Sequence, residues 1–286
     1  MFKRSTVKLL RFHFSFFLLP VYLFALSQVP KIETIDALII FFVLHLLVYP
    51  SSNGYNSYMD RDETSVGGIA KPLQPTRELF LVSVIMDISA ILISLIVSIP
   101  FACSVLLYIL ASRAYSYRGI RLKKYPILGY LTVCIFQGAV TYWMVYHGAS
   151  ADKSFNVSPV ALIAASLLMG SFYPLTQIYQ HEADLKDGVK TISYLLGYKG
   201  TFVFTAIVYS LAMGSLAIYF KNLNNLKNFW VLTIVLFPVL LYFFYWANLV
   251  WKDYKNADFK HTMNMNLLAS VCTNTAFIII LTGRLF

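Results

Sequence analysis

Charged residues are scarce in this sequence. Only 13% of its 286 residues are Asp, Glu, Lys or Arg, whereas a soluble domain has about 25%. Cysteine is also rare: Cys103, Cys134 and Cys272 all lie in apolar runs and have no metal-ligand spacing, which argues against disulfides and a zinc site. The net charge of +10 comes from basic residues scattered over short loops, so we expect no nucleic-acid partner.

Long hydrophobic runs dominate instead. The chain is 58% hydrophobic, with a mean hydropathy of +0.66. Because a transmembrane helix needs about 20 mostly apolar residues, the sequence predicts an all-α polytopic membrane protein with about nine spans. These are residues 12–28, 35–49, 79–98, 101–114, 127–146, 159–173, 201–220, 229–251 and 263–281. The second, fourth and sixth runs are short, which predicts helices that continue beyond the bilayer. Only a tight break at Ile99-Pro100 separates the third from the fourth, so eight spans is an alternative.

The basic residues predict an orientation. With the N-terminus inside, 18 of the 23 Lys and Arg residues fall on the inner side. Cytoplasmic loops carry such an excess, so we expect the N-terminus and the loops after even-numbered spans to be cytoplasmic. The predicted location is the inner (cytoplasmic) membrane. Most acidic residues lie in the inner loops after the second and sixth spans.

A repeat connects those two loops. Residues 50–63, P-S-S-N-G-Y-N-S-Y-M-D-R-D-E, match residues 174–187, P-L-T-Q-I-Y-Q-H-E-A-D-L-K-D, in the pattern P-x4-Y-[NQ]-x3-D-x2-[DE]. Positions i, i+4 and i+7 share one face of a helix, so each copy is expected to present an amide and two carboxylates in a column. The predicted metal ligands are Asn56, Asp60, Glu63, Gln180, Asp184 and Asp187. This all-oxygen set suits Mg²⁺ or Mn²⁺ and not zinc. The alternative is an ordinary pair of polar loops.

The same residues carry a family resemblance. N-S-Y-M-D-R-D-E-T (56–64) and Q-H-E-A-D-L-K-D-G-V-K-T (180–191) resemble the N-D-x-x-D-x-x-x-D and D-x-x-x-D motifs of the UbiA superfamily of intramembrane prenyltransferases. Y-S-Y-R-G-I-R-L-K-K (115–124) is similar to the family's Y-S-x-x-x-x-R-L-K segment, and G-G-I-A-K-P-L (67–73) to the stretch that usually contains R-P-L. Ser57, Thr64 and Gln180 stand where the family has Asp. We expect Glu63 and Asp187 to replace the lost carboxylates.

The resemblance implies a single UbiA-like domain over residues 1–286, with its helices around a central cavity. It implies Mg²⁺-dependent transfer of an isoprenoid chain from a polyprenyl diphosphate to a small aromatic or lipid-precursor acceptor, with the chain in a groove open to membrane lipid. The implied catalytic residues are Asp60, Asp184, Arg121 and Tyr115. Lys71, Arg118, Arg121, Lys123 and Lys190 are the residues expected to bind the diphosphate. The sequence names neither the acceptor nor the chain length.

Other functions stay open at this point. A transporter also has repeats and intramembrane acids, although the acids here cluster at one membrane face. The altered motif positions leave room for a UbiA-like binding protein without catalysis, and a terpene cyclase of the same family is a third alternative. Asp87, in the middle of a span, is expected either to face the cavity or to pair with a polar group of a neighbouring helix. His181 is expected to face solvent.

Overall fold

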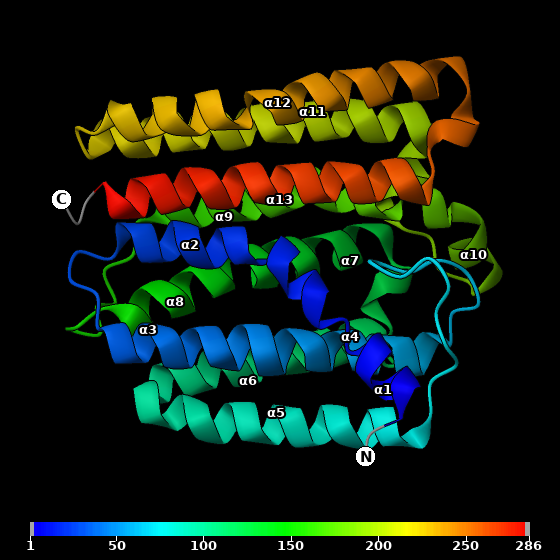
Figure 1. Ribbon diagram of the computed structural model, residues 1–286, viewed down its shortest axis with the longest axis horizontal. Helices are drawn as coiled ribbons and strands as arrows, with labels where there is room; N and C mark the ends of the chain where they lie inside the picture. The colour runs from blue at the N-terminus through cyan, green and yellow to red at the C-terminus, as the bar shows by residue number, and fades with distance from the viewer. Residues whose placement is uncertain (1–2, 284–286) are drawn as a thin grey trace.

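The computed structural model describes residues 3–283, which form helices joined by short loops (Figure 1). Within this part of the chain there is no strand, and the two β-bridges are isolated pairs of residues. Eight helices within the described residues are long and apolar enough to cross a membrane. Residues Arg4–Phe17 and Leu19–Gln28 make a ninth span if the bent pair, with its 42° angle, is counted as one. The predicted all-α membrane fold is confirmed.

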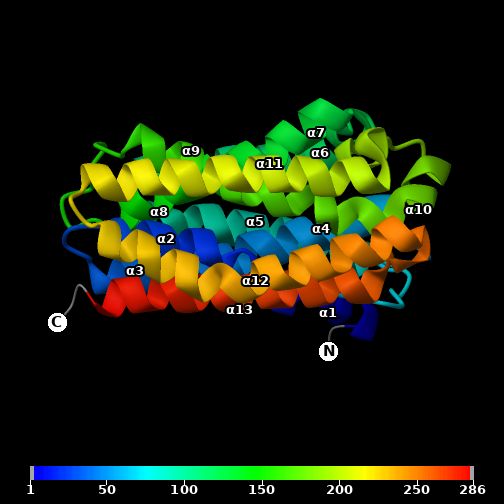
Figure 2. The ribbon, with the colours of Figure 1, turned by 90° about the horizontal axis from the view of Figure 1, so that it is seen from above.

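The long helices run side by side along the longest axis of the molecule (Figures 1 and 2). In chain order the elements are α1 (Arg4–Leu9), η1 (Phe12–Phe17), α2 (Leu19–Gln28), α3 (Thr34–Phe41), η2 (Phe42–Val48), α4 (Tyr49–Asp60), α5 (Arg77–Val97), α6 (Ile99–Ser116), η3 (Leu122–Lys124), α7 (Pro126–Val133), η4 (Cys134–Val140), α8 (Thr141–Ala149), α9 (Pro159–Phe172), η5 (Tyr173–Gln180), α10 (His181–Lys186), α11 (Ile192–Asn222), α12 (Leu226–Lys252), η6 (Tyr254–Asn256) and α13 (Phe259–Thr282). The segments η2 and η4 are π-helical and the other η segments are 3₁₀-helical.

The short spans behave as the sequence predicts. The second continues through α4 to Asp60, and the sixth continues through η5 and α10 to Lys186. Between α5 and α6 the backbone of Ser98 is extended (φ −174°, ψ 158°), and its Oγ accepts the N–H of Phe101 at 3.1 Å. Pro100 lies in the first turn of α6, where its missing N–H costs nothing. The break therefore separates two spans, so this pair does not give the eight-span alternative. The total is eight or nine depending on whether the bent pair Arg4–Phe17 and Leu19–Gln28 is counted as one span.

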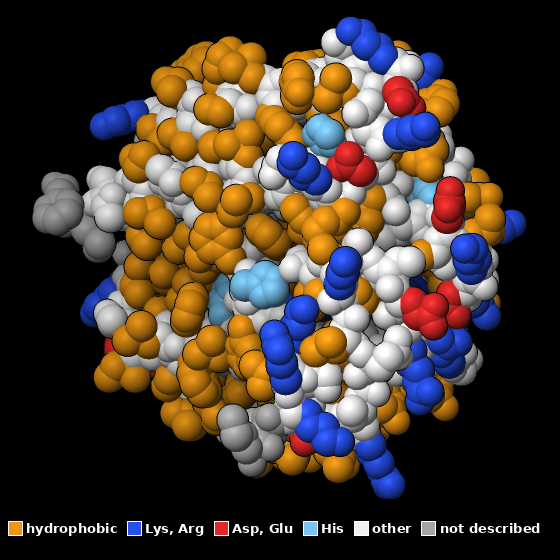
Figure 3. All heavy atoms as spheres, turned by 45° about the vertical axis from the view of Figure 1, so that its right-hand side comes forward, with side chains coloured by type: hydrophobic (Ala, Val, Ile, Leu, Met, Phe, Trp, Pro, Cys, Tyr) orange, Lys and Arg blue, Asp and Glu red, His pale blue; other side chains and the backbone are white. Residues whose placement is uncertain are grey.

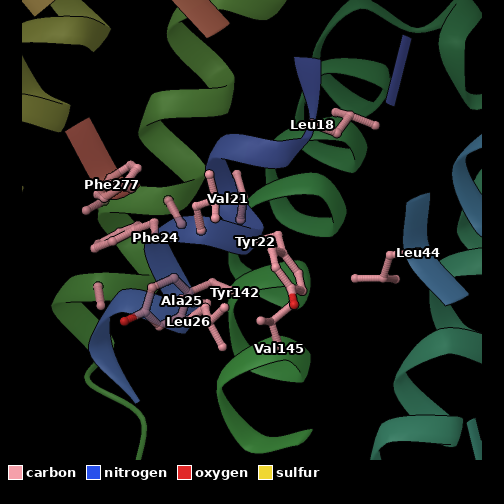
Figure 4. Close-up of a cluster of buried hydrophobic side chains, with 14 of the residues drawn as sticks. Leu18, Val21, Tyr22, Phe24, Ala25, Leu26, Leu44, Tyr142, Val145 and Phe277 are labelled. Carbon is pink, nitrogen blue, oxygen red and sulfur yellow. The ribbon is translucent and has the colours of Figure 1, made fainter. Parts of the chain in front are cut away.

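Helix α2 lies in the centre of the bundle. All residues from 21 to 29 are buried. The ring of Phe24 stacks on Phe277 of α13 and meets Tyr142 of α8 edge-on, with ring centroids 4.8 Å apart in both pairs (Figure 4). The outward faces of the outer helices carry exposed apolar residues such as Ile96 and Ile234. An apolar exterior over an apolar core is typical of an integral membrane protein.

Two polar residues inside the bundle answer questions that the sequence raised. Asp87 of α5 is ion-paired with Arg113 of α6. Of the two expectations for Asp87, pairing with a polar group of a neighbouring helix is therefore the one that the structure shows. His181 is buried. Its Nε2 lies 2.8 Å from Ser193 Oγ, and its ring stacks on that of Tyr198 with the centroids 4.9 Å apart. The expectation that His181 faces solvent is wrong.

Candidate functional site

A cavity of about 220 Å³ lies at the α10 end of the bundle. Figure 3, which brings this end forward, shows most of the visible Lys, Arg, Asp and Glu side chains on this end and mainly apolar side chains on the rest of the visible face. Both copies of the sequence repeat reach the cavity. Its wall contains Asn56 and Asp60 from α4 and Gln180 and Asp184 from the η5–α10 segment. Four of the six predicted metal ligands are therefore brought together.

The end of α4 decides which acidic residues reach the cavity. Arg61 adopts a left-handed conformation (φ 54°, ψ 43°), and its N–H donates to the carbonyl of Ser57 at 3.0 Å. The helix thus ends at Asp60, and the expected column of side chains ends with it. Asp62 then turns back to line the cavity, whereas Glu63 is exposed and lies outside it. The prediction that Glu63 lies on the same helix as Asn56 and Asp60 is wrong, because α4 ends before it.

The second copy of the repeat folds differently from the first. It begins in the 3₁₀ segment η5, and α10 starts directly after Gln180. Asp187 follows the end of α10 and lies outside the cavity wall. Its carboxylate is ion-paired with Arg121 and lies 3.4 Å from Nη1 of Arg118. Asp187 therefore fastens the loop that carries Arg121, and the same guanidinium also lies beside Asp60, but Asp187 itself does not line the cavity.

The carboxylates at the cavity are crowded. The side chain of Asp60 is 5% exposed, is ion-paired with Lys123, and has its Oδ1 3.5 Å from Nη2 of Arg121. That Oδ1 is buried and accepts no hydrogen bond among the described residues. Burial, and next the neighbouring Asp60 carboxylate, raise the pKa of Asp62 to about 6. An added cation would stabilise both charged carboxylates.

The loop between α6 and α7 carries three of the residues predicted to bind diphosphate, of which Lys123 lines the cavity and Arg118 and Arg121 lie just outside its wall. Arg121, which is left-handed (φ 52°), donates from Nη1 to the carbonyl of Asp187 at 2.9 Å. Arg118 donates from Nε to the carbonyl of Met59 at 2.8 Å. This loop thus connects the ends of the two repeat copies. Lys71 and Lys190 are exposed and lie outside the cavity wall, so the structure does not bring them to the other predicted diphosphate ligands.

Deeper in the cavity the walls become aromatic. The hydroxyls of Tyr115 and Tyr173 are hydrogen-bonded to each other, and both residues line the cavity. Further along α6, the ring of Tyr108 meets that of Phe136 edge-on, with centroids 6.4 Å apart. The site is therefore charged near the ends of the repeat copies and apolar within the bundle. A ligand with a charged head and an apolar chain matches this division.

Two cavity residues escaped the sequence analysis. Asp62 belongs to the repeat, but its helical position pointed away from the column. Arg11 stands just before the first apolar run, where a basic residue is normally only a topology signal. Its backbone is left-handed (φ 50°), and its guanidinium donates to the carbonyls of Gly67 at 3.3 Å and Asn53 at 3.2 Å. Only the fold places this segment against the cavity.

The oxygen donors at the cavity fit a hard divalent cation that is coordinated partly by the protein and partly by a bound phosphorylated ligand. Within residues 3–283, no three His, Cys, Asp or Glu side chains are close enough to hold a metal ion by themselves. Amide and carboxylate oxygens nevertheless line one space, and Asp60 Oδ1 has a free lone pair there. Mg²⁺ usually binds one or two carboxylates together with water and phosphate oxygens. The residues present fit such an ion bound with a phosphorylated ligand.

The chain resembles known proteins in both sequence and fold. The model of the UbiA prenyltransferase family matches residues 16–268. A UbiA homologue from Archaeoglobus fulgidus bound to DMAPP and Mg²⁺ is 16% identical, with a TM-score of 0.72 over 97% of this chain and 99% of that one. A UbiA homologue from Aeropyrum pernix K1 is 18% identical, with a TM-score of 0.71 over 93% and 97%. At this identity the two structures show a shared fold. No curated protein matches the chain.

Proposed function

Since the chain belongs to the UbiA prenyltransferase family, we propose that it is a Mg²⁺-dependent intramembrane prenyltransferase. It moves an isoprenoid chain from a polyprenyl diphosphate to a small acceptor. The observation that carries this proposal is the meeting of Asp60 and Asp184, from two distant segments, beside Lys123 in one cavity with an aromatic interior. Structures of the Archaeoglobus fulgidus homologue bound to DMAPP or GPP with Mg²⁺ support the choice of substrate and ion.

Several residues would hold the ion and the diphosphate. The proposed Mg²⁺ ligands are Asn56, Asp60, Asp62, Gln180 and Asp184, all of which line the cavity. When bound, Mg²⁺ neutralises charge on the diphosphate and makes it a better leaving group. Lys123 and Arg121, whose partners are now Asp60 and Asp187, would exchange part of these contacts for diphosphate oxygens.

The reaction exchanges one bond for another. The bond between the first prenyl carbon and the diphosphate oxygen breaks, and the diphosphate leaves with the electron pair. Tyr115 and Tyr173 lie on the path from the charged to the apolar part of the cavity, where their ring faces stabilise the allylic cation. The acceptor then forms a bond to that carbon and releases one proton.

The altered motif positions support retained catalysis. Ser57 is buried and Thr64 is exposed, and neither lines the cavity. Having Ser and Thr in place of Asp at these two positions therefore removes no carboxylate from the cavity wall. Asp62 supplies a third carboxylate there, and Gln180 still offers an amide oxygen. These placements favour an enzyme over a binding protein without catalysis.

We also propose that the cavity opens to the cytoplasm and that the protein lies in the inner membrane. The excess of Lys and Arg on the loops of the α10 end supports this orientation. The transporter alternative has less support, because the acidic cluster lies at one end of the bundle and not at its middle.

Diphosphate release tests the proposal. Purified protein in lipid nanodiscs is mixed with geranyl or geranylgeranyl diphosphate and a pool of aromatic and phosphoglycerol acceptors, in Mg²⁺ or EDTA. We expect release only in Mg²⁺, together with a new prenylated mass. Release without an adduct would favour a cyclase. Absence of release at every chain length would overturn the proposal in favour of a binding protein.

A further inference from the structure

Helix α1 lies on the outside of the bundle, where it contacts α4 and α5 (Figures 1 and 2). Its inner face is apolar. Leu9 and Leu10 pack with Val66, Ile69 and Leu79 in a small core that is separate from the main one. This packing holds the helix against α5 and the loop after α4, so its other face is turned outward.

The outer face of α1 combines cations with an exposed apolar side chain. Lys3, Arg4 and Lys8 are exposed, and Val7, which lies between them, is 51% exposed. Residues three and four positions apart lie on the same side of a helix, so Val7 shares its face with Lys3 and Arg4. A short helix with basic residues and an exposed aliphatic group on one face is typical of a membrane interface.

The exposed apolar surface continues in the next element. The segment η1 leads from α1 away from the α10 end of the bundle and toward α2 (Figure 1). Its Phe12 and Phe16 are 40% and 36% exposed. Cations at one level and exposed rings at the next follow the order of a phospholipid, in which a charged headgroup precedes the acyl chains.

Two further cations come to the same region from the segment before α5. The amine of Lys8 donates to the carbonyl of Lys71 at 3.3 Å, and the backbone N–H of Lys3 donates to Glu78 Oε1 at 2.8 Å. These contacts bring the exposed residues Lys71 and Arg77 beside α1. We call this group of five exposed cations the basic surface: Lys3, Arg4, Lys8, Lys71 and Arg77.

The basic surface has no carboxylate partners of its own. Among residues 3–283, none of its five side chains forms an ion pair, whereas Arg118, Arg121 and Lys123 beside the cavity each form one. Glu78 is held by a backbone N–H and supplies one negative charge against five positive ones. Clusters of four to eight Lys and Arg residues next to a membrane-embedded segment attract anionic lipids.

We propose that the basic surface binds the headgroups of anionic phospholipids, with Val7, Phe12 and Phe16 against the adjoining part of their acyl chains. A topology signal would require only that basic residues stay on one side of the membrane. Here an anchored helix also turns them outward together with an apolar side chain. The inference gives Lys71 a role away from the cavity, and it does not depend on the proposed prenyltransferase activity.

Lipid binding tests this inference directly. The full chain is purified in a non-ionic detergent and titrated with phosphatidylglycerol or with phosphatidylcholine of the same acyl chains, and native mass spectrometry counts the bound lipids. We expect the first phosphatidylglycerol to bind about tenfold or more tightly than phosphatidylcholine, since contacts to one or two Lys or Arg residues are enough for that ratio. Inorganic phosphate at millimolar concentration should not displace the lipid, because it has no acyl chains.

Variants then assign the preference to α1. The triple variant Lys3→Gln/Arg4→Gln/Lys8→Gln is expected to reduce the ratio to about twofold or less. The matched control, Lys31→Gln/Lys221→Gln/Lys227→Gln, removes the same charge from the opposite end of the bundle and should leave the ratio unchanged.

The apolar part of the surface is tested separately. Val7→Gln should weaken the binding of both lipids severalfold without changing their ratio, because it removes an apolar contact and no charge. All the substituted residues are exposed, and thermal melting confirms that each variant is folded.

Three results would overturn the inference. Equal binding of the two lipids by the unaltered protein would show that the basic surface does not select a headgroup. An equal loss in the control variant would show that net charge alone attracts the lipid. Displacement of phosphatidylglycerol by inorganic phosphate would show a site for a free anion. Failure of the proposed prenyltransferase activity would leave all three measurements unaffected.

Discussion

Asp87 in α5 and Arg113 in α6 form an ion pair inside the bundle, and the same arginine holds α4. Nε of Arg113 donates to Asp87 Oδ2 at 3.0 Å, and Nη2 donates to Ser51 Oγ at 2.7 Å. The guanidinium also lies 4.1 Å from the ring centroid of Tyr55. Ser51 and Tyr55 belong to the helix whose other side presents Asn56 to the cavity. The pair therefore fixes a wall of the site without lining it.

Breaking this pair should destabilise the protein. We expect Asp87→Leu or Arg113→Met alone to lower the free energy of unfolding by about 3–5 kcal/mol, because each leaves a buried charge unpaired. The double variant should be more stable than either single variant, since no charge is left. Chemical denaturation in detergent measures the difference. Glu182→Gln, an exposed change, is the control. A double variant less stable than both singles would contradict this account.

The acids of the cavity should matter more than those outside it. We expect Asp60→Asn and Asp184→Asn to lower kcat/KM about 100-fold or more, because each removes charge where the ion and diphosphate would bind. Asp62→Asn should cost more activity than Glu63→Gln, since only Asp62 lines the cavity. Steady-state diphosphate release over a Mg²⁺ titration measures both effects. If Glu63→Gln were the more damaging change, the end of α4 would have to be rebuilt when the ion binds.

Adjacent lysines offer a matched comparison of diphosphate contacts. Lys123 lines the cavity and pairs with Asp60, whereas Lys124 lies outside the wall, with its amine 4.9 Å from the ring centroid of Tyr125. We expect Lys123→Ala to raise the KM for geranyl diphosphate about tenfold, the value of one charge-assisted hydrogen bond. Lys124→Ala should change it less than about twofold. Equal effects would mean that the loop contributes only general positive charge.

Tyr115 should act through its ring more than through its hydroxyl. Its hydroxyl is hydrogen-bonded to that of Tyr173, and a hydrocarbon chain has no group that could hydrogen-bond to it. We expect Tyr115→Phe to keep kcat within about threefold and Tyr115→Ala to lower it about 30-fold, as the loss of about 2 kcal/mol of cation–π stabilisation requires. Single-turnover rates with geranyl diphosphate distinguish the two. A large loss in Tyr115→Phe would instead assign a role to the hydroxyl pair.

The sequence predicts the arrangement of spans and half of the site. Hydrophobic length is a local property, so the helices and the break before Pro100 could be located from it. Asn56 and Asp60 are four residues apart on a real helix, and they reach the cavity together. The metal and diphosphate roles of these residues stay predictions, as do those of Gln180, Asp184 and Lys123.

What the sequence could not give was backbone conformation at single residues. The helical column assumed that α4 continued past Asp60, and one left-handed arginine ends it there. An arginine in that conformation has no sequence signature, unlike glycine or asparagine. Likewise, nothing local to Arg11 or Asp87 indicates what lies across from them. Those neighbours come from segments distant in sequence, and only the packing of helices decides them.

The central position of α2 has a consequence for how the protein is made. This helix leaves the ribosome long before α13, yet its buried ring Phe24 stacks on Phe277 of α13. Gln28, at its other end, accepts a hydrogen bond from Tyr219 at 3.3 Å. During synthesis these surfaces must stay in lipid, or with an insertion chaperone, until α11 and α13 have emerged. A chain stopped before α13 would therefore expose its own centre to the quality-control proteases of the membrane.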